Sequence, residues 1–144
     1  MATIREIDVQ QLTDEVIGGV VDLQRDIHMH PEIGFDTVRT AALVAEQLRA
    51  AGIETREGIG KTGVVGDIDV PGATRRIAFR ADMDALPMDE EADLPHKSTI
   101  PGAAHMCGHD AHTTLDDAGE DCWKLCKLFL IVILLRLESA EPLI

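Results

Sequence analysis

Residues 105–112 constrain the fold of this chain most, because they place one thiol, three imidazoles and one carboxylate within eight positions. Thiolates and neutral histidines are borderline-soft ligands that hold zinc and related divalent ions. Gly108, between Cys107 and His109, lets the backbone bend tightly around a bound atom. A metal site is therefore the leading hypothesis, and a closed site needs further donors from elsewhere in the fold.

The length and charge of the chain narrow the classes of protein to consider. A chain of 144 residues is about one domain. Hydrophobic residues make up 45% and charged residues 27%, which is typical of a soluble globular protein, and aromatic residues at 3% leave an aliphatic core. The formal charge of -13 argues against nucleic acid as a partner and does not favour an anionic membrane surface.

The sequence also predicts a compartment. The first eleven residues contain no apolar segment of the secretory type. The longest apolar run, residues 128–135, is eight residues long, whereas a helix needs ~20 to cross a bilayer. An odd number of cysteines, three, fits a reducing compartment. We therefore expect a cytoplasmic protein without a membrane partner.

Two amphipathic helices are predicted in the first third of the chain. Apolar residues recur at helical spacing over residues 9–28, and a second, alanine-rich pattern covers residues 36–51. The polar side chains of His28, His30 and Glu32 lie at the exit of the first helix. From spacing alone, a solvated helix end with a turn is favoured over a ligand role for these three.

Short strands are predicted next, around a glycine-rich loop at residues 58–63. A strand at residues 53–56 precedes the loop, and a strand at residues 64–70 follows it. Pro71-Gly72 is a turn signal, which predicts a hairpin between that second strand and residues 76–81.

Asp82 and Asp84 come directly after the predicted hairpin. In an extended backbone their i, i+2 spacing points both carboxylates the same way, but a pair of loop-capping aspartates fits the spacing equally well. Residues 85–104 show no periodicity and predict a long loop. Beyond it, residues 113 and 114 could cap a helix, and residues 128–135 form either a buried strand or a short helix.

Four ordered segments carry a resemblance to a known family. They are residues 28–35 (His-Met-His-Pro-Glu-Ile-Gly-Phe), 60–65 (Gly-Lys-Thr-Gly-Val-Val), 79–87 (Phe-Arg-Ala-Asp-Met-Asp-Ala-Leu-Pro) and 105–113 (His-Met-Cys-Gly-His-Asp-Ala-His-Thr). Together they resemble the amidohydrolase branch of the M20 metallopeptidase family, which contains hippurate hydrolase and N-acyl-amino-acid amidohydrolases. Four segments in the same order over about 115 residues make chance agreement implausible.

The resemblance implies a fold and a set of site residues. The fold is α/β, the amino-terminal portion of a zinc-peptidase-like catalytic domain with helices packed on a mixed sheet. Cys107 and His109 correspond to metal ligands of the family. Asp84 takes a supporting role that orients or polarises a ligand. The resemblance also suggests that Asp82, Asp110 and His112 support the ligands without touching the metal.

The resemblance further implies an activity. The family is a group of enzymes, hydrolases that act on linear amides, and an intact site holds two divalent metals such as zinc, manganese, cobalt or nickel. The metals acidify a water molecule and polarise the scissile carbonyl. The substrates are small N-acyl or N-aroyl amino acids, and full-length relatives can form homodimers through a lid or dimerisation domain later in their chains.

The resemblance covers residues 1–115, and residues 116–144 read as a divergent tail without a family match. Family members continue with a Glu-Glu-Gly segment, whose first glutamate is the general base, whereas Glu138 and Glu141 are isolated acids and no histidine follows His112. Loss of a general base removes ~10²- to 10⁴-fold of rate. We expect a truncated chain that is inactive alone, with a tail in another reading frame or of unrelated origin, which the downstream DNA sequence would test.

The sequence leaves two alternatives to an active amidohydrolase open. One is a non-catalytic remnant that at most binds a metal or a homologous subunit. The other is a small α/β domain in which Cys107, His109 and the aspartates are ordinary core and loop residues. Cys122 and Cys126 precede an apolar run and are expected to be buried thiols without a site.

Overall fold

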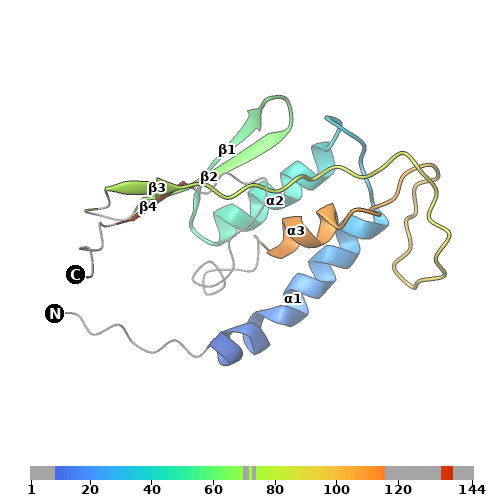
Figure 1. The fold of residues 1–144 in the computed structure, drawn as a ribbon, viewed down its shortest axis with the longest axis horizontal. Coiled ribbons are helices and arrows are strands. Elements are labelled where there is room, and N and C mark those ends of the chain that lie inside the picture. Colours follow the sequence, from blue (N-terminus) through green and yellow to red (C-terminus); the bar gives the residue numbers. More distant parts are fainter. Residues whose placement is uncertain (1–8, 70–71, 73, 116–133, 138–144) are drawn as a thin grey trace, which may run out of the picture.

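The computed structural model describes residues 9–69, 72, 74–115 and 134–137 (Figure 1). The helices are α1 (Val9–Met29), α2 (Val38–Ala50) and α3 (His109–Leu115). The strands are β1 (Glu54–Ile59), β2 (Gly63–Ile68), β3 (Arg75–Ile77) and β4 (Leu134–Leu137). Helices packed beside a small sheet confirm the predicted α/β class, and both predicted helices are present within two residues of their expected ends.

The sheet has the order β1-β2-β4-β3 and mixes two kinds of pairing. β1 and β2 form an antiparallel hairpin, β2 pairs with β4 in parallel, and β4 pairs with β3 antiparallel. The glycine-rich loop is shorter than expected, because β1 continues to Ile59 and β2 begins at Gly63. The segment predicted as a divergent tail therefore contributes a strand between two strands of the recognised part.

The predicted hairpin of residues 64–70 with residues 76–81 is wrong. β2 has β1 on one edge and β4 on the other, and β3 pairs only with β4 among the described strands. A Pro-Gly turn reverses the chain, but it does not determine which strand lies next to which. Of the apolar run at residues 128–135, the last two residues belong to β4, and residues 128–133 lie outside the described part.

The core lies between α2 and the hairpin. Ala41, Val44, Ala45 and Leu48 form the buried face of α2, at the i, i+3, i+4, i+7 spacing of an amphipathic helix. Together with Val64 of β2 and Met83 they form the hydrophobic core cluster. Met83 belongs to the segment that leaves the sheet. This packing therefore places that segment against α2, with Met83 buried.

Glu32 caps the start of α2 and is not part of a solvated helix end. Its carboxylate accepts the backbone N–H groups of Arg39 at 2.9 Å and Thr40 at 2.7 Å. These N–H groups belong to the first turn of a helix, where they have no partner within the helix, and a carboxylate there also meets the positive end of the helix dipole.

α1 and α3 pack side by side on the other side of the molecule from the β1–β2 hairpin (Figure 1). Ile27 of α1 is fully buried. Thr113 and Thr114 lie inside α3 and are buried, so the prediction that they cap a helix is wrong, and the helix begins at His109 instead.

Residues 85–104 form the long loop that the sequence predicts. Isolated bridges join Ile33 to Ala85 and Leu86 to Ala104, and no helix or longer strand interrupts the loop.

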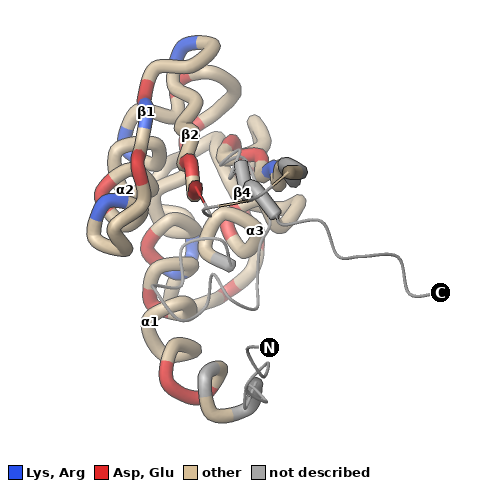
Figure 2. Tube along the Cα trace, turned by 90° about the vertical axis from the view of Figure 1, so that its left-hand side faces the viewer, with Lys and Arg blue, Asp and Glu red and all other residues tan. Residues whose placement is uncertain are grey.

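Acidic residues are distributed over α1 and the β1–β2 hairpin, with basic residues interspersed (Figure 2). In the part of the chain that the structure describes, no helix is long and apolar enough to cross a membrane.

Candidate metal centre

Cys107 and His109 lie on a tight turn at the start of α3. Gly108 between them has φ +74°, in the left-handed region that favours glycine, and its carbonyl accepts the backbone N–H of His112 at 3.0 Å. The Cys107 side chain is exposed. The backbone therefore turns from an exposed thiol directly into the first residue of a helix.

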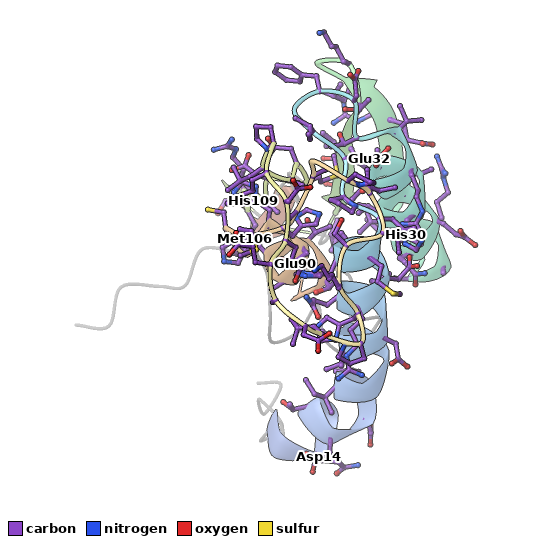
Figure 3. All side chains as sticks on the ribbon, turned by 90° about the vertical axis from the view of Figure 1, so that its right-hand side faces the viewer. Asp14, His30, Glu32, Glu90, Met106 and His109 are labelled. Atoms are coloured by element: carbon purple, nitrogen blue, oxygen red, sulfur yellow. The ribbon has the colours of Figure 1, made fainter. Side chains whose placement is uncertain are left out.

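His109 is held in the orientation that a metal ligand requires. Its Nδ1–H donates to the backbone carbonyl of Asp84 at 2.7 Å, and the Asp84 carboxylate Oδ1 lies 3.3 Å from the same nitrogen. A proton fixed on Nδ1 leaves the lone pair of Nε2 free, which is how metal-binding histidines are commonly oriented. His109 lies on the same side of the molecule as Glu90, at the far end of α1 from Asp14 (Figure 3). The supporting role expected for Asp84 has a geometric counterpart in this contact.

The donor set of the described residues is incomplete. Cys107 supplies an exposed thiol and His109 a free Nε2, which is the soft and borderline donor chemistry that suits zinc, cobalt or nickel. Among the residues that the structure describes, no three His, Cys, Asp or Glu side chains lie close enough together to hold a metal ion. These residues therefore fit two ligands of a metal centre but not a closed coordination shell.

The side chains of Asp82 and Asp84 contact different partners. The Asp82 carboxylate accepts from Arg80 at 2.5 Å, and the Asp82 carbonyl accepts the hydroxyl of Thr113 at 3.3 Å. Both aspartates also line a cavity of about 340 Å³, whose apolar lining includes Phe35, Ile59 and Met83. A small molecule in this cavity would lie next to the residue that holds His109.

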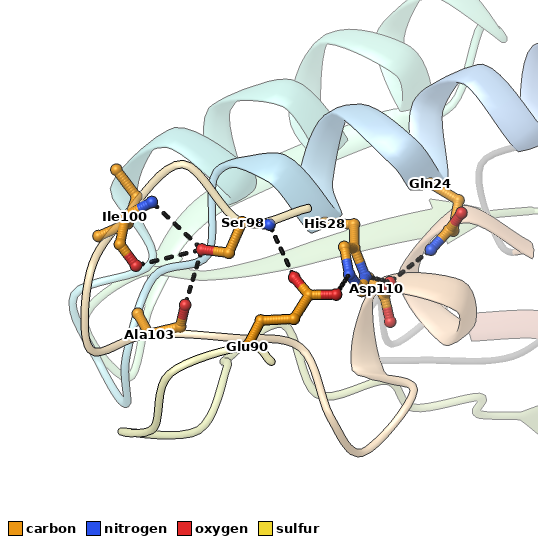
Figure 4. Close-up of polar contacts among 7 residues, drawn as sticks. All are labelled: Gln24, His28, Glu90, Ser98, Ile100, Ala103 and Asp110. Carbon is orange, nitrogen blue, oxygen red and sulfur yellow. Dashed lines mark hydrogen bonds and ion pairs between the residues drawn. The ribbon is translucent and has the colours of Figure 1, made fainter. Parts of the chain in front are cut away.

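The Asp110 side chain is buried within the protein. Its carboxylate Oδ2 accepts from His28 Nδ1 at 2.7 Å and from Gln24 Nε2 at 2.5 Å. The other nitrogen of the His28 ring, Nε2, lies 3.2 Å from Glu90 Oε1 (Figure 4). The expectation of a solvated helix end is therefore wrong for His28, which is buried between two carboxylates.

The charges of this buried cluster stabilise one another. Burial lowers the pKa of His28, but the hydrogen bonds and charges of Asp110 and Glu90 outweigh it and raise the pKa above the ordinary 6.5. Burial raises the pKa of Asp110, yet hydrogen bonds from His28 and Gln24 hold it below the ordinary 3.8. The backbone N–H of Ser98 lowers the pKa of Glu90 below 4.5.

Two further histidines surround His28. The His96 ring meets it edge-on at 5.5 Å between centroids, and the His105 ring lies at 6.3 Å. Neither nitrogen of His105 has a hydrogen-bond partner, and burial lowers its pKa below 6.5. Burial therefore favours the neutral form of the His105 ring beside His28.

We predict that the free energy of unfolding of the metal-free chain depends on pH through this cluster. The stabilisation from Glu90, whose pKa is lowered, is present above pH 4.5 and is lost as the pH falls through its folded pKa. The stabilisation from His28, whose pKa is raised, is complete below pH 6.5 and is lost as the pH rises through its folded pKa. His105, whose pKa is lowered, adds stability as the pH rises toward 6.5, so urea denaturation should show a maximum in the upper part of the range from pH 4.5 to 6.5.

A His28→Gln variant is the control for this prediction. It should lose most of the decline in unfolding free energy on the alkaline side, because it removes the group that titrates there. An unchanged decline in that variant would assign the effect to other groups.

Sequence reasoning missed His28 and Glu90 as members of the cluster. His28 follows Gln24 by four positions and Val21 by seven, so it lies on the same face of α1 as a residue of the apolar pattern. That position was the available signal for burial. No comparable pattern marks Glu90, because it lies in the long loop.

Comparison with known proteins supports the relation suggested by the four segments. The model of the peptidase family M20/M25/M40 matches residues 78–115. Hippurate hydrolase of Campylobacter jejuni is 50% identical over 92 residues, 64% of this chain and 24% of that protein. The IAA-amino acid hydrolase ILR1-like 5 of Arabidopsis thaliana is 45% identical over 96 residues, 67% of this chain and 22% of that protein.

A solved structure is similar over the same part of the chain. The Bacillus subtilis YXEP protein, described as a dinuclear metal binding peptidase from the M20 family, has a TM-score of 0.66 and 37% sequence identity. It covers 70% of this chain, which in turn covers 29% of that protein. The chain thus spans about a quarter of the length of the curated relatives that it matches.

Proposed function

Because this chain carries the amino-terminal part of an M20 peptidase family member of the amidohydrolase branch, we propose that it forms the metal-binding portion of a hydrolase that cleaves N-acyl or N-aroyl amino acids. The observation that carries this proposal is the contact of His109 Nδ1 with the Asp84 carbonyl at 2.7 Å, which leaves Nε2 of this ring, two residues after Cys107, free to bind a metal. Similarity to a hippurate hydrolase and to IAA-amino acid hydrolases supports an amide of an amino acid as the substrate.

Each site residue has a defined task in this proposal. Cys107 and His109 hold a divalent metal, and Asp84 fixes the ring of His109 from behind. Such a metal, one of two in an intact site, would lower the pKa of water and polarise the amide carbonyl. Zinc, manganese, cobalt and nickel are the candidates. A thiolate ligand needs a reducing compartment, and we therefore propose the cytoplasm.

The cavity beside Asp84 supports a small-molecule substrate. Its volume of about 340 Å³ lies at the low end of the range for ligand pockets. It combines apolar side chains, Phe35 and Ile59, with the charged side chains of Arg80 and Asp82. An acyl or aroyl group joined to an amino acid has the same combination of an apolar and a charged end.

The second candidate function is a non-catalytic remnant that binds a metal or a homologous subunit. It is favoured by the absence of a third metal donor near the pair among the described residues. It is also favoured by the sequence after Thr114, which has no adjacent pair of glutamates for a general base and a further ligand. We propose that the 144-residue chain alone binds a metal without turning over substrate.

Hydrolysis of hippurate distinguishes the two candidates. The purified chain would be assayed for release of glycine with added manganese, zinc or cobalt, alongside a titration of metal binding. We expect metal binding without release of glycine, because general base catalysis is missing. Release of glycine that is abolished in a Cys107→Ser variant would instead assign catalysis to this chain, and the remnant would be rejected.

A further inference from the structure

His28 connects three separate segments through the two nitrogens of one buried ring. Nδ1 bonds to Asp110, 82 residues later in the chain, and Nε2 bonds to Glu90, 62 residues later. Only 8% of His28 is exposed, so these bonds are shielded from water. A protonated ring donates to both carboxylates at once, and its raised pKa is consistent with this state.

Both carboxylates are fixed by a second donor as well. Gln24 donates to the Asp110 oxygen that His28 also contacts, and the backbone N–H of Ser98 donates to Glu90 Oε2 at 2.7 Å (Figure 4). The Ser98 hydroxyl in turn donates to the Ala103 carbonyl at 2.7 Å. The hydrogen bonds therefore run from α1 into the long loop, close to where that loop leads into residues 105–109.

Asp110 and His109 are held on two different sides of α3. Consecutive residues of a helix point about 100° apart. His109 is anchored on one side to Asp84, and Asp110 is anchored on the other side to His28. α3 begins at His109, and the residue that connects its first turn to Cys107 is a glycine. The turn that carries the two ligands is therefore fixed in rotation by two anchors on neighbouring residues.

We propose that His28 is a positioning residue of the metal centre, which sets the turn of Cys107 and His109 by holding Asp110. This inference rests on the proposed function, since it assumes that this pair binds a metal. A packing role alone would also explain the burial of His28, because α1 lies against α3. The two roles differ in what they predict for metal affinity when folding is preserved.

Two substitutions of His28 separate its two hydrogen bonds. The amide nitrogen of asparagine lies close to the position of Nδ1, so His28→Asn keeps a donor for Asp110 and loses the bond to Glu90. The amide nitrogen of glutamine lies close to the position of Nε2, so His28→Gln keeps a donor for Glu90 and loses the bond to Asp110. Both variants remove the positive charge and one buried hydrogen bond, which makes them matched in their expected loss of stability.

The readout is cobalt binding to the full chain with Cys122 and Cys126 replaced by serine, so that Cys107 is the only thiol. The charge-transfer absorption between thiolate and cobalt reports binding at Cys107 directly. We expect His28→Gln to weaken cobalt binding about 10- to 100-fold, the usual effect of losing a group that orients a ligand. His28→Asn should stay within about threefold of the parent chain, since it retains the donor to Asp110.

Unfolding by urea, measured on the same samples, shows whether each variant is folded. Equal cobalt affinity in the parent chain and in both folded variants would overturn the proposal, as would equal weakening in both. If His28→Gln does not fold, Gln24→Met tests the same anchor from its other donor and should also weaken binding. A parent chain without the thiolate absorption would reject the metal centre itself and this role of His28 with it.

Discussion

Replacing Cys107 with serine should weaken cobalt or zinc binding more than about 100-fold, beyond the effect of removing a group that merely orients a ligand. A thiolate is a soft donor that serine cannot replace, and the described residues place no third donor near the pair to compensate. His109→Ala should have an equally large effect, because it removes the only imidazole whose Nδ1 is held by the Asp84 carbonyl. Isothermal titration calorimetry with either metal measures both losses.

Matched controls make this result specific. Cys126→Ser removes a thiol to which no site is assigned and should leave the affinity unchanged. His30→Ala removes an imidazole whose Nδ1 bonds to the Asp26 carbonyl of its own helix, and it too should have no effect. If metal content is the same in Cys107→Ser, in His109→Ala and in the parent chain, the ligand assignment is wrong.

Gly63→Ala should destabilise the chain by about 1–3 kcal/mol. Gly63 is the first residue of β2, and a Cβ added there would lie 2.4 Å from the backbone oxygen of Ile59. The neighbour is backbone at the end of a hairpin with a register irregularity between Glu57 and Ile59, so it cannot rotate away as a side chain could. Chemical denaturation followed by far-ultraviolet circular dichroism measures the effect.

Gly18→Ala is the matched control, with an expected effect of opposite sign. Gly18 lies within α1, and an added Cβ would meet nothing within 4 Å. Alanine in a helix interior is more favourable than glycine by about 0.5–1 kcal/mol, so this variant should be more stable than the parent chain. A Gly63→Ala variant as stable as the parent chain would contradict the hairpin geometry.

The helices were predictable from the sequence because their signal is local. Apolar spacing located α1 and α2. The sheet was predictable only in part. Strand segments were found, but the partner of β2 was wrong, because β4 comes from residues 134–137 and local patterns do not encode a contact between segments so far apart.

The candidate site, too, was predictable from the sequence only in part. The turn with Cys107, Gly108 and His109 was recognisable from residue types alone, and the contact of Asp84 with His109 agrees with the role expected from the family resemblance. The role of His28 was not recognisable. Its partners lie 62 and 82 residues away, and spacing within one helix exit cannot distinguish a solvated histidine from one that is buried between two carboxylates.

The position of a bound metal tests the central claim most directly. Crystals of the chain grown with cobalt would be measured at the cobalt absorption edge, so that the anomalous difference map locates the ion. We expect a peak about 2.0–2.3 Å from both Cys107 Sγ and His109 Nε2, the usual distances for such ligands. A peak on other residues, or a His109 ring bound through Nδ1 instead of bonded to Asp84, would contradict the account.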